Sequence, residues 1–163
     1  MELGTTIIGC LVLLLCIIPF IVIGYKRRLE SKNKLQELMS YAAKYNSSIQ
    51  NYELWGNSSI GIDETSHQVF FISLERGSKI FQRIELSHIE NCAINNNSSS
   101  ITANNKNYRI VEKITLCFSP KDKKLEKQYI NIYHAELHQL PIAGELNIAE
   151  KWNALINASI SKM

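Results

Sequence analysis

The sequence lacks the short motifs that usually identify an enzyme or a metalloprotein. Its four cysteines never occur as C-x-x-C, its four histidines never form H-E-x-x-H, and no glycine-rich phosphate loop or G-x-S-x-G motif is present. No residue therefore has a recognisable catalytic, cofactor-binding or metal-binding role. We predict a non-enzymatic chain with no catalytic residue, no cofactor and no metal site.

The few residues that could suggest chemistry have simpler interpretations. His134 and His138 have a spacing that binds zinc only on a helix. The residues before them are typical of a strand, and Leu140-Pro141 follows closely, so we expect these histidines at the surface or in loops. Cys92 and Cys117 lie in apolar, strand-like runs, which favours small core residues over a disulfide.

Charge is absent from residues 5–25, TTIIGCLVLLLCIIPFIVIGY. A transmembrane helix needs roughly 20 predominantly apolar residues. A cleaved signal peptide would have a basic start and a small-residue cleavage site, but residues 1–4 contain no Lys or Arg and no such site follows. A lipoprotein signal is also disfavoured, because leucines precede Cys16. We predict a short extracytoplasmic N-terminus at 1–4 and an uncleaved transmembrane helix at 5–25.

Basic residues are concentrated just after this apolar run. Residues 26–46 contain six basic and two acidic side chains, and Lys and Arg near a span stay on the cytoplasmic side. The chain is therefore predicted to be single-pass, with the N-terminus outside and a cytoplasmic C-terminal domain. The same cluster can set topology alone or also contact anionic lipid headgroups, and the residues predicted for that contact are Lys26, Arg27, Arg28, Lys32 and Lys34.

The rest of the chain shows no excess of charge. Residues 47–163 contain 12 basic and 12 acidic side chains, and a nucleic-acid binder needs a concentrated basic surface. We therefore expect no nucleic-acid partner. A basic loop is the alternative lipid-contacting group, and its lysines are Lys121, Lys123, Lys124 and Lys127. Charged hairpin tips are, however, usually only solvated.

The segment 26–51 is predicted to be a basic helical linker. Its apolar or small residues recur three and four positions apart, which is one face of a helix: Leu35, Leu38, Ala42, Tyr45, Ile49 and Tyr52. This face could join two protomers in a short coiled coil or pack against the following domain. We favour packing within the chain, because the repeat is too short for a coiled coil.

Residues 52–163 are predicted to form an antiparallel β-meander closed by a helix. Alternating or β-branched runs bounded by turn residues indicate strands, here expected at 59–63, 69–74, 80–86, 89–94, 110–118 and 128–134. The polar stretch 95–107 is expected to be a mobile loop. An amphipathic pattern over the last 20 residues predicts a helix whose Trp152 and Leu155 plug the sheet.

This order of elements resembles the pleckstrin-homology-like (PH-like) fold in its bacterial membrane-anchored, Bacteroidetes-type form. The resemblance covers residues 52–162 and is carried by three segments: YELWGNSSIGIDETSHQVFFISL, IELSHIENCAI and LNIAEKWNALINASI. It implies an α+β fold with a β-meander or barrel of about six or seven strands, and a location in the bacterial inner membrane. The phosphoinositide site of eukaryotic relatives is not implied, because the connection at 64–67, Glu-Thr-Ser-His, lacks basic residues.

The resemblance implies a binding or scaffolding module rather than an enzyme. We predict a membrane-tethered module that presents its PH-like domain to an unidentified protein partner or to the membrane surface. The alternative is an enzyme or a small-ligand sensor with an unrecognised site in the β-domain. A deep polar pocket containing titratable groups with strongly shifted pKa values would favour that alternative.

Overall fold

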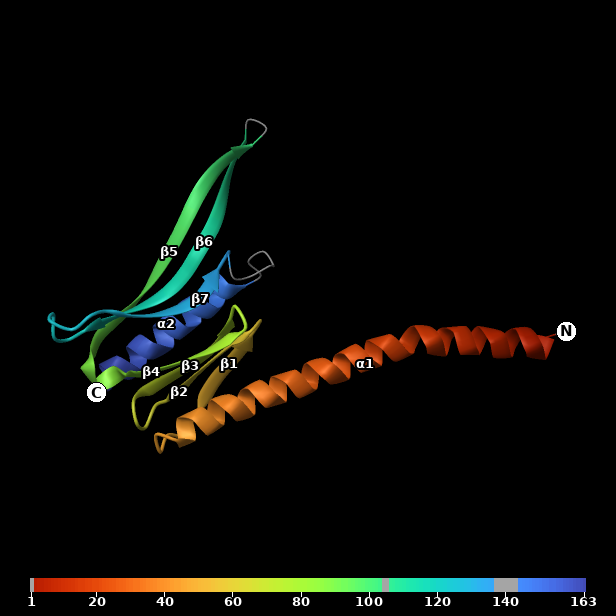
Figure 1. Ribbon diagram of the computed structural model, residues 1–163, viewed down its shortest axis with the longest axis horizontal. Coiled ribbons are helices and arrows are strands. Elements are labelled where there is room, and N and C mark those ends of the chain that lie inside the picture. Colours follow the sequence, from red (N-terminus) through yellow and green to blue (C-terminus); the bar gives the residue numbers. More distant parts are fainter. Residues whose placement is uncertain (1, 104–105, 137–143) are drawn as a thin grey trace. The chain divides into compact units, whose positions relative to one another are not determined.

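The computed structural model describes residues 2–103, 106–136 and 144–163, with side chains described at 16, 18–99, 111–136 and 144–163. The chain divides into two compact units, Met1–Glu37 and Leu38–Met163. The first unit is the greater part of helix α1, Glu2–Ala43. The second contains the last turns of α1, seven strands, the short 3-10 helix η1 (Leu86–His88) and helix α2, Glu145–Ser161 (Figure 1).

The predicted membrane span over residues 5–25 is contradicted by the structure. None of the helices formed by the described residues is both long and apolar enough to cross a membrane. The same finding corrects the extracytoplasmic N-terminus, the integral-membrane partner and the single-pass inner-membrane localisation.

Seven strands form two antiparallel sheets in the second unit. The first sheet has the order β1-β2-β3-β4 and the second the order β5-β6-β7. The strands are β1 Asn51–Trp55, β2 Ser58–Asp63, β3 Gln68–Glu75, β4 Ser78–Glu85, β5 Ile89–Ala103, β6 Lys106–Pro120 and β7 Gln128–His134. The α+β class and the closing helix agree with the prediction. The predicted closed barrel is wrong, because no ladder joins the two sheets across the described residues.

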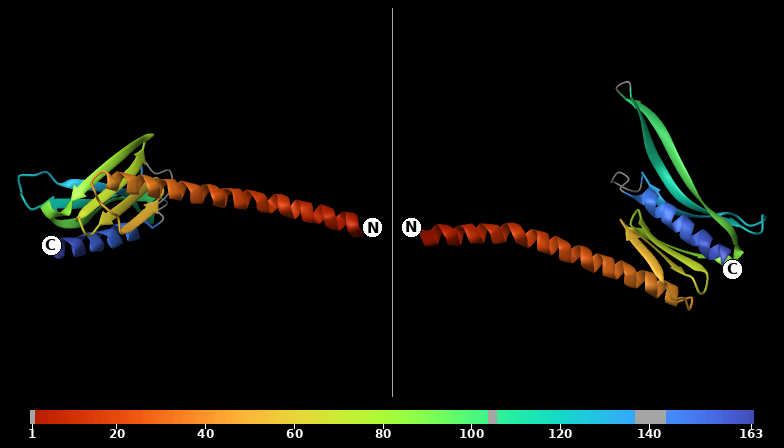
Figure 2. Two further views of the ribbon diagram at one scale, coloured as in Figure 1. Left: turned by 90° about the horizontal axis from the view of Figure 1, so that it is seen from below. Right: turned by 180° about the vertical axis from the view of Figure 1, so that it is seen from behind.

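Two local predictions are also wrong. Residues 95–107 were expected to be a loop, but β5 and β6 extend through most of this stretch as one long hairpin, whose strands run side by side in Figure 2. Backbone pairing with apolar partners, such as Asn96 with Ile114, outweighs the low strand propensity of Asn and Ser. The helical pattern was extended to Tyr52, yet α1 ends at Ala43 and Tyr52 lies in β1.

The last turns of α1 pack on the outer face of the first sheet. Leu38 and Ala42 are fully buried there with Ile49, Phe70 and Ile72. This arrangement confirms packing within the chain for this part of the predicted apolar face. Among its other members, the side chain of Tyr45 is 42% exposed.

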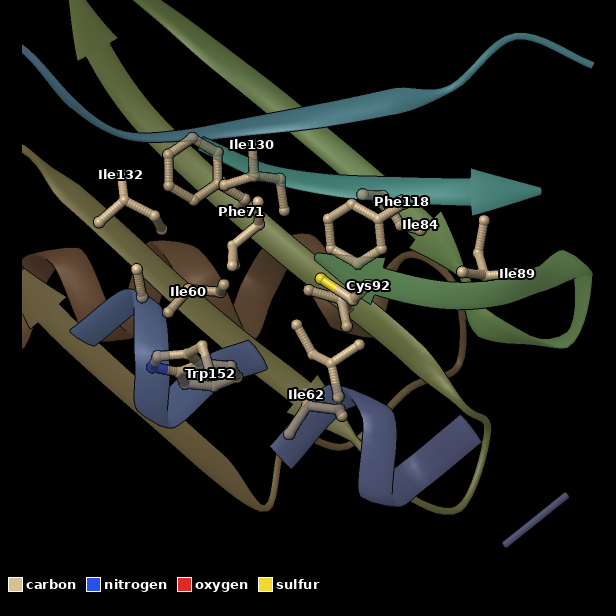
Figure 3. Packing of buried hydrophobic residues seen from close by; sticks show 14 of the residues in the cluster. Ile60, Ile62, Phe71, Ile84, Ile89, Cys92, Phe118, Ile130, Ile132 and Trp152 are labelled. Atoms are coloured by element: carbon tan, nitrogen blue, oxygen red, sulfur yellow. The ribbon is translucent and has the colours of Figure 1, made fainter. Parts of the chain in front are cut away.

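The main core lies between the two sheets and is closed by α2. Alternate residues of β2, β3, β6 and β7 point inward and meet Trp152, which is 1% exposed (Figure 3). The predicted plug is therefore confirmed for Trp152, while Leu155 packs against the cluster as a half-buried residue and Ile156 is fully buried. Asn157 also fixes α2 to β5: its Oδ1 accepts the N–H of Cys92 at 2.9 Å and its Nδ2 donates to the Cys92 carbonyl at 2.8 Å.

Candidate functional site

Strand β4 forms one edge of the first sheet. It follows β3 through the two-residue turn Arg76-Gly77, in which both residues have positive φ, 49° and 82°. Such turns match the twist of a tight hairpin, and the glycine adopts this backbone at no steric cost. The turn fixes the register, with Glu75 opposite Ser78.

The open edge of β4 is defined by the residues whose backbone groups point away from β3. Just beyond β4, the Leu86 N–H donates to the His67 carbonyl at 2.9 Å, so Leu86 points towards the β3 side. Hydrogen-bonding direction alternates along an antiparallel strand. The outward N–H and C=O groups consequently belong to Lys79, Phe81, Arg83 and Glu85, which we call the β4 edge.

The β4 edge lies close to the start of β7, itself an edge strand. Gln82 Nε2 donates a hydrogen bond to the Tyr129 carbonyl at 3.2 Å. A side chain thus makes the hydrogen bond that a neighbouring backbone would make in a continuous sheet. Within the described part of the chain, neither strand has a ladder partner on this side.

A hollow of about 530 Å³ lies beside the C-terminal half of the β4 edge. Arg83 and Glu85 line it from β4 and form an ion pair at 2.5 Å, while His88 approaches the Glu85 carboxylate at 3.7 Å. The other lining residues come from the start of β5 and the β6–β7 connection: Ile89, Pro120, Leu125, Glu126, Lys127 and Gln128. Polar and apolar groups are mixed, as in a surface that contacts polypeptide.

The side chains of the β4 edge lie on the same face as the end of α1. Phe81 is 44% exposed and its ring contacts Tyr41 at a centroid distance of 5.1 Å. The guanidinium of Arg83 lies 4.4 Å from the ring centroid of Tyr45, within range of a cation–π contact. Burial, and then the neighbouring Tyr45, raises the pKa of Tyr41 above its usual value, although Arg83 opposes this shift. Leu74 adds a further exposed apolar side chain.

A second hollow, of about 370 Å³, lies near the β3–β4 turn. It is lined by Glu75, Arg76, Ile80, Lys113, Asn131, His134 and Glu136. The Oδ1 atom of Asn131 is buried there without a hydrogen-bond partner among the described residues. The residues that line this hollow come from both sheets.

The basic residues predicted to contact lipid lie in two separate groups. Four of the α1 residues, Lys26, Arg27, Arg28 and Lys32, are exposed, and Lys34 is half-buried. The loop residues Lys121, Lys123, Lys124 and Lys127 are all exposed. Lys121 Nζ donates to the Ser87 carbonyl at 2.8 Å, and Lys127 lines the larger hollow. Nothing in these contacts tests the predicted lipid binding, which stays a prediction.

The histidines and cysteines are dispersed. His67 Nδ1 lies 3.4 Å from Ser159 Oγ, His88 faces Glu85, His134 lines the smaller hollow, and His138 lies outside the described residues. Where side chains are described, no three His, Cys, Asp or Glu residues are grouped as metal ligands would be. Cys92 is a buried free thiol, and burial, with a smaller effect of Cys117, raises its pKa to about 12.

Sequence reasoning missed the β4 edge. The alternation of Ile80, Gln82 and Ile84 identified the inward face of the strand but not its position at the edge of a sheet. A signal was present in the complementary residues, which read Lys, Phe, Arg and Glu after an Arg-Gly turn. In comparisons with known proteins, no family model, curated protein or solved structure matches the chain.

Proposed function

We propose that this chain is a non-enzymatic protein-binding module, in which the β4 edge takes up an extended segment of a partner protein as an added strand. The observation that carries the proposal is the run of outward-pointing backbone groups on β4 beside the 530 Å³ hollow. Strand addition supplies affinity through main-chain hydrogen bonds, and adjoining pockets supply specificity. The PH-like resemblance of residues 52–162 belongs to the same proposal.

The state of the edge supports this function. Natural proteins protect exposed edges with charges, prolines, bulges or covering segments. Strand β4 has a regular register over eight residue pairs and contains no proline or bulge, although three of its four outward residues, Lys79, Arg83 and Glu85, are charged. Two of its apolar residues, Ile80 and Phe81, are 37% and 44% exposed. A regular edge with exposed apolar side chains is suited to pairing with another strand.

The titratable groups favour binding over catalysis. Among the described groups with a clear pKa shift, Asp63 lies at the end of β2, Cys92 lies in the core, and Tyr41 of α1 packs against Phe70 and Phe81. None of the three lines either hollow. Catalytic groups with perturbed pKa values usually gather in a cleft, so the alternative of an enzyme has no comparable support.

The test is a selection of displayed random peptides on the immobilised full chain, followed by affinity measurements with labelled versions of the selected peptides. Phe81→Pro removes an outward N–H, a substitution that edge strands accept without losing a ladder bond. We expect it to weaken peptide binding by about tenfold or more. Melting curves of both proteins verify that the fold is kept.

Tyr52→Pro is the matched control, because it introduces the same residue at an exposed position of β1, the opposite edge of the sheet. It should leave peptide binding unchanged. Selection of no peptide, or equal binding by the wild type and the Phe81→Pro variant, would overturn the proposed function.

A further inference from the structure

We infer that the segment fitting the β4 edge is β4 of a second copy of the chain, so that the module associates with itself through an antiparallel β4–β4 pair. The inference rests on the proposed function and names the partner of that same site. It starts from the chemical order of the outward residues, which is Lys79, Phe81, Arg83 and Glu85. An incoming antiparallel strand must present complementary residues in the reverse order.

The sequence of β4 is complementary to itself in one register. When Gln82 lies opposite Gln82 of the second copy, Lys79 faces Glu85 and Phe81 faces Arg83, and two-fold symmetry repeats each pair. Opposite charges directly across two strands are stabilising, and an arginine over an aromatic ring adds a cation–π contact. All four outward residues take part, so this register also makes the most backbone hydrogen bonds.

The two neighbouring registers are unfavourable. A shift that places Phe81 opposite Phe81 brings Lys79 against Arg83 and leaves Glu85 without a partner across the strands. The opposite shift places Arg83 against Arg83 of the second copy. Like charges directly opposite each other are destabilising. A shift by one residue would instead match outward-pointing with inward-pointing backbone groups, which cannot form a ladder. The charges therefore select one register.

Two of the other edge strands, β1 and β5, make hydrogen bonds to other elements of their own chain. On β1, Glu53 Oε2 accepts from Lys151 Nζ and Trp152 Nε1, both at 2.9 Å, and Trp55 Nε1 donates to the Ile132 carbonyl at 3.1 Å. On β5, Cys92 is bound by Asn157 through both of its backbone groups. The β4 edge has the longer regular register and the complementary charges.

The larger hollow lies beside the position that the Lys79 side chain of the second copy would take. In the selected register, Lys79 of the second copy comes beside Glu85, and Glu85 lines the 530 Å³ hollow. The exposed ring of Phe81 would be covered at the same time by the Arg83 side chain of the other copy. Pairing thus occupies the hollow and covers an exposed apolar surface in one step.

A charge-reversal experiment tests the register on the full chain. Lys79→Glu and Glu85→Lys each place like charges opposite one another twice in a symmetric pair. Either variant alone should self-associate about tenfold or more weakly than the wild type in sedimentation equilibrium. An equimolar mixture of the two variants should associate again, as should the double variant, because opposite charges then face each other. Lys124→Glu and Glu90→Lys, at exposed positions outside the β4 edge, are the matched controls and should change nothing.

Cross-linking gives an independent measure of the same contact. In this register, residue 82 lies opposite residue 82 of the second copy as a non-hydrogen-bonded pair. The Cα atoms of such a pair are about 4.5 Å apart, which is within the range that a disulfide spans. Gln82→Cys should therefore form a covalent dimer under mild oxidation, above the background given by the native cysteines. Lys124→Cys, in the β6–β7 connection, should not.

The outcomes separate this inference from the proposed function. If the chain stays monomeric but binds selected peptides that Phe81→Pro rejects, the partner is another protein and the inference is overturned while the proposed function stands. If the chain associates but the charge reversals have no effect, association occurs elsewhere and the inference is also overturned. If it neither associates nor binds peptides, both are wrong.

Discussion

At the residue scale, the Asp63 carboxylate organises the connection between α1 and the first sheet. It is 3% exposed and accepts backbone N–H groups from Ser48 at 2.7 Å, Thr65 at 2.9 Å and Ser66 at 3.0 Å. Gln50 Nε2 adds a longer contact at 3.4 Å. Burial alone would raise the pKa of Asp63, but these hydrogen bonds outweigh it and lower the pKa from 3.8 to about 2.

The depressed pKa predicts a pH-dependent stability. A carboxylate with a lower pKa in the folded state stabilises the protein above its unfolded pKa, and this stabilisation is lost as the pH falls from about 4 towards 2. The shift corresponds to roughly 2–3 kcal/mol. Asp63→Asn should therefore lower the free energy of unfolding by about this amount at pH 7, and by much less at pH 2, when measured by urea titration.

Asp122→Asn provides the control for this pH dependence. Asp122 lies in the exposed β6–β7 connection and accepts one N–H, from Lys124 at 2.9 Å. Its substitution should change stability little at either pH. A constant difference between the wild type and Asp63→Asn from pH 7 to pH 2 would contradict the role given to the ionised carboxylate.

At the element scale, a glycine in β2 lets the chain after α1 approach the first sheet closely. A Cβ atom added at Gly61 would lie 2.8 Å from Ile49 Cγ2, 2.9 Å from Ile49 Cδ1 and 3.2 Å from Leu38 Cδ2. The first two distances are shorter than any ordinary carbon contact. Close packing of this segment on β2 thus requires glycine at this position.

Gly61→Ala should destabilise the domain by about 1–3 kcal/mol, the usual cost of overpacking a core. The same substitution in an Ile49→Ala background should cost markedly less, because the two closest methyl groups are gone. Chemical unfolding of the two single variants and the double variant gives the coupling energy. Additive effects would show that Ile49 and Gly61 do not press on each other.

The elements differ in how far the sequence predicts them. The closing helix was predictable, because Trp152 and Ile156 have helical spacing and their faces are buried. The length of the β5–β6 hairpin was not, since Asn95 and its polar neighbours indicate a loop and only pairing with β6 holds them extended. The candidate site was missed for a related reason: Phe81 and Arg83 lie at an edge because of strand order, and the alternation within β4 shows only which of its side chains face the core.

At the scale of the whole molecule, the boundary between the two units falls inside α1, between Glu37 and Leu38. Leu38 and Ala42 belong to the core cluster on the first sheet. The folding unit therefore begins within a helix, and the last turns of α1 are part of the β-domain.

Truncations test this boundary. A chain starting at residue 34 keeps one helical turn before Leu38 and should melt within about 2 °C of the full chain, because no core residue is removed. A chain starting at residue 47 loses Leu38 and Ala42, exposes Phe70, and should be destabilised by about 2–4 kcal/mol. Calorimetry of the full chain and of both truncated chains measures these differences. If the two truncated chains melt at the same temperature, the β-domain begins after residue 46 and the prediction is wrong.

The amide of Asn157 limits how far strand pairing between copies can extend. By occupying both backbone groups of Cys92, it denies part of β5 to an incoming β4 strand. Head-to-tail pairing of β4 with β5 would leave a free end on every copy and would grow into an open filament. Pairing of β4 with β4 uses the same edge on both copies, so the assembly is isologous and closes at two subunits. The Asn157 side chain on α2 thus favours an assembly that closes at two subunits over one that grows by adding copies.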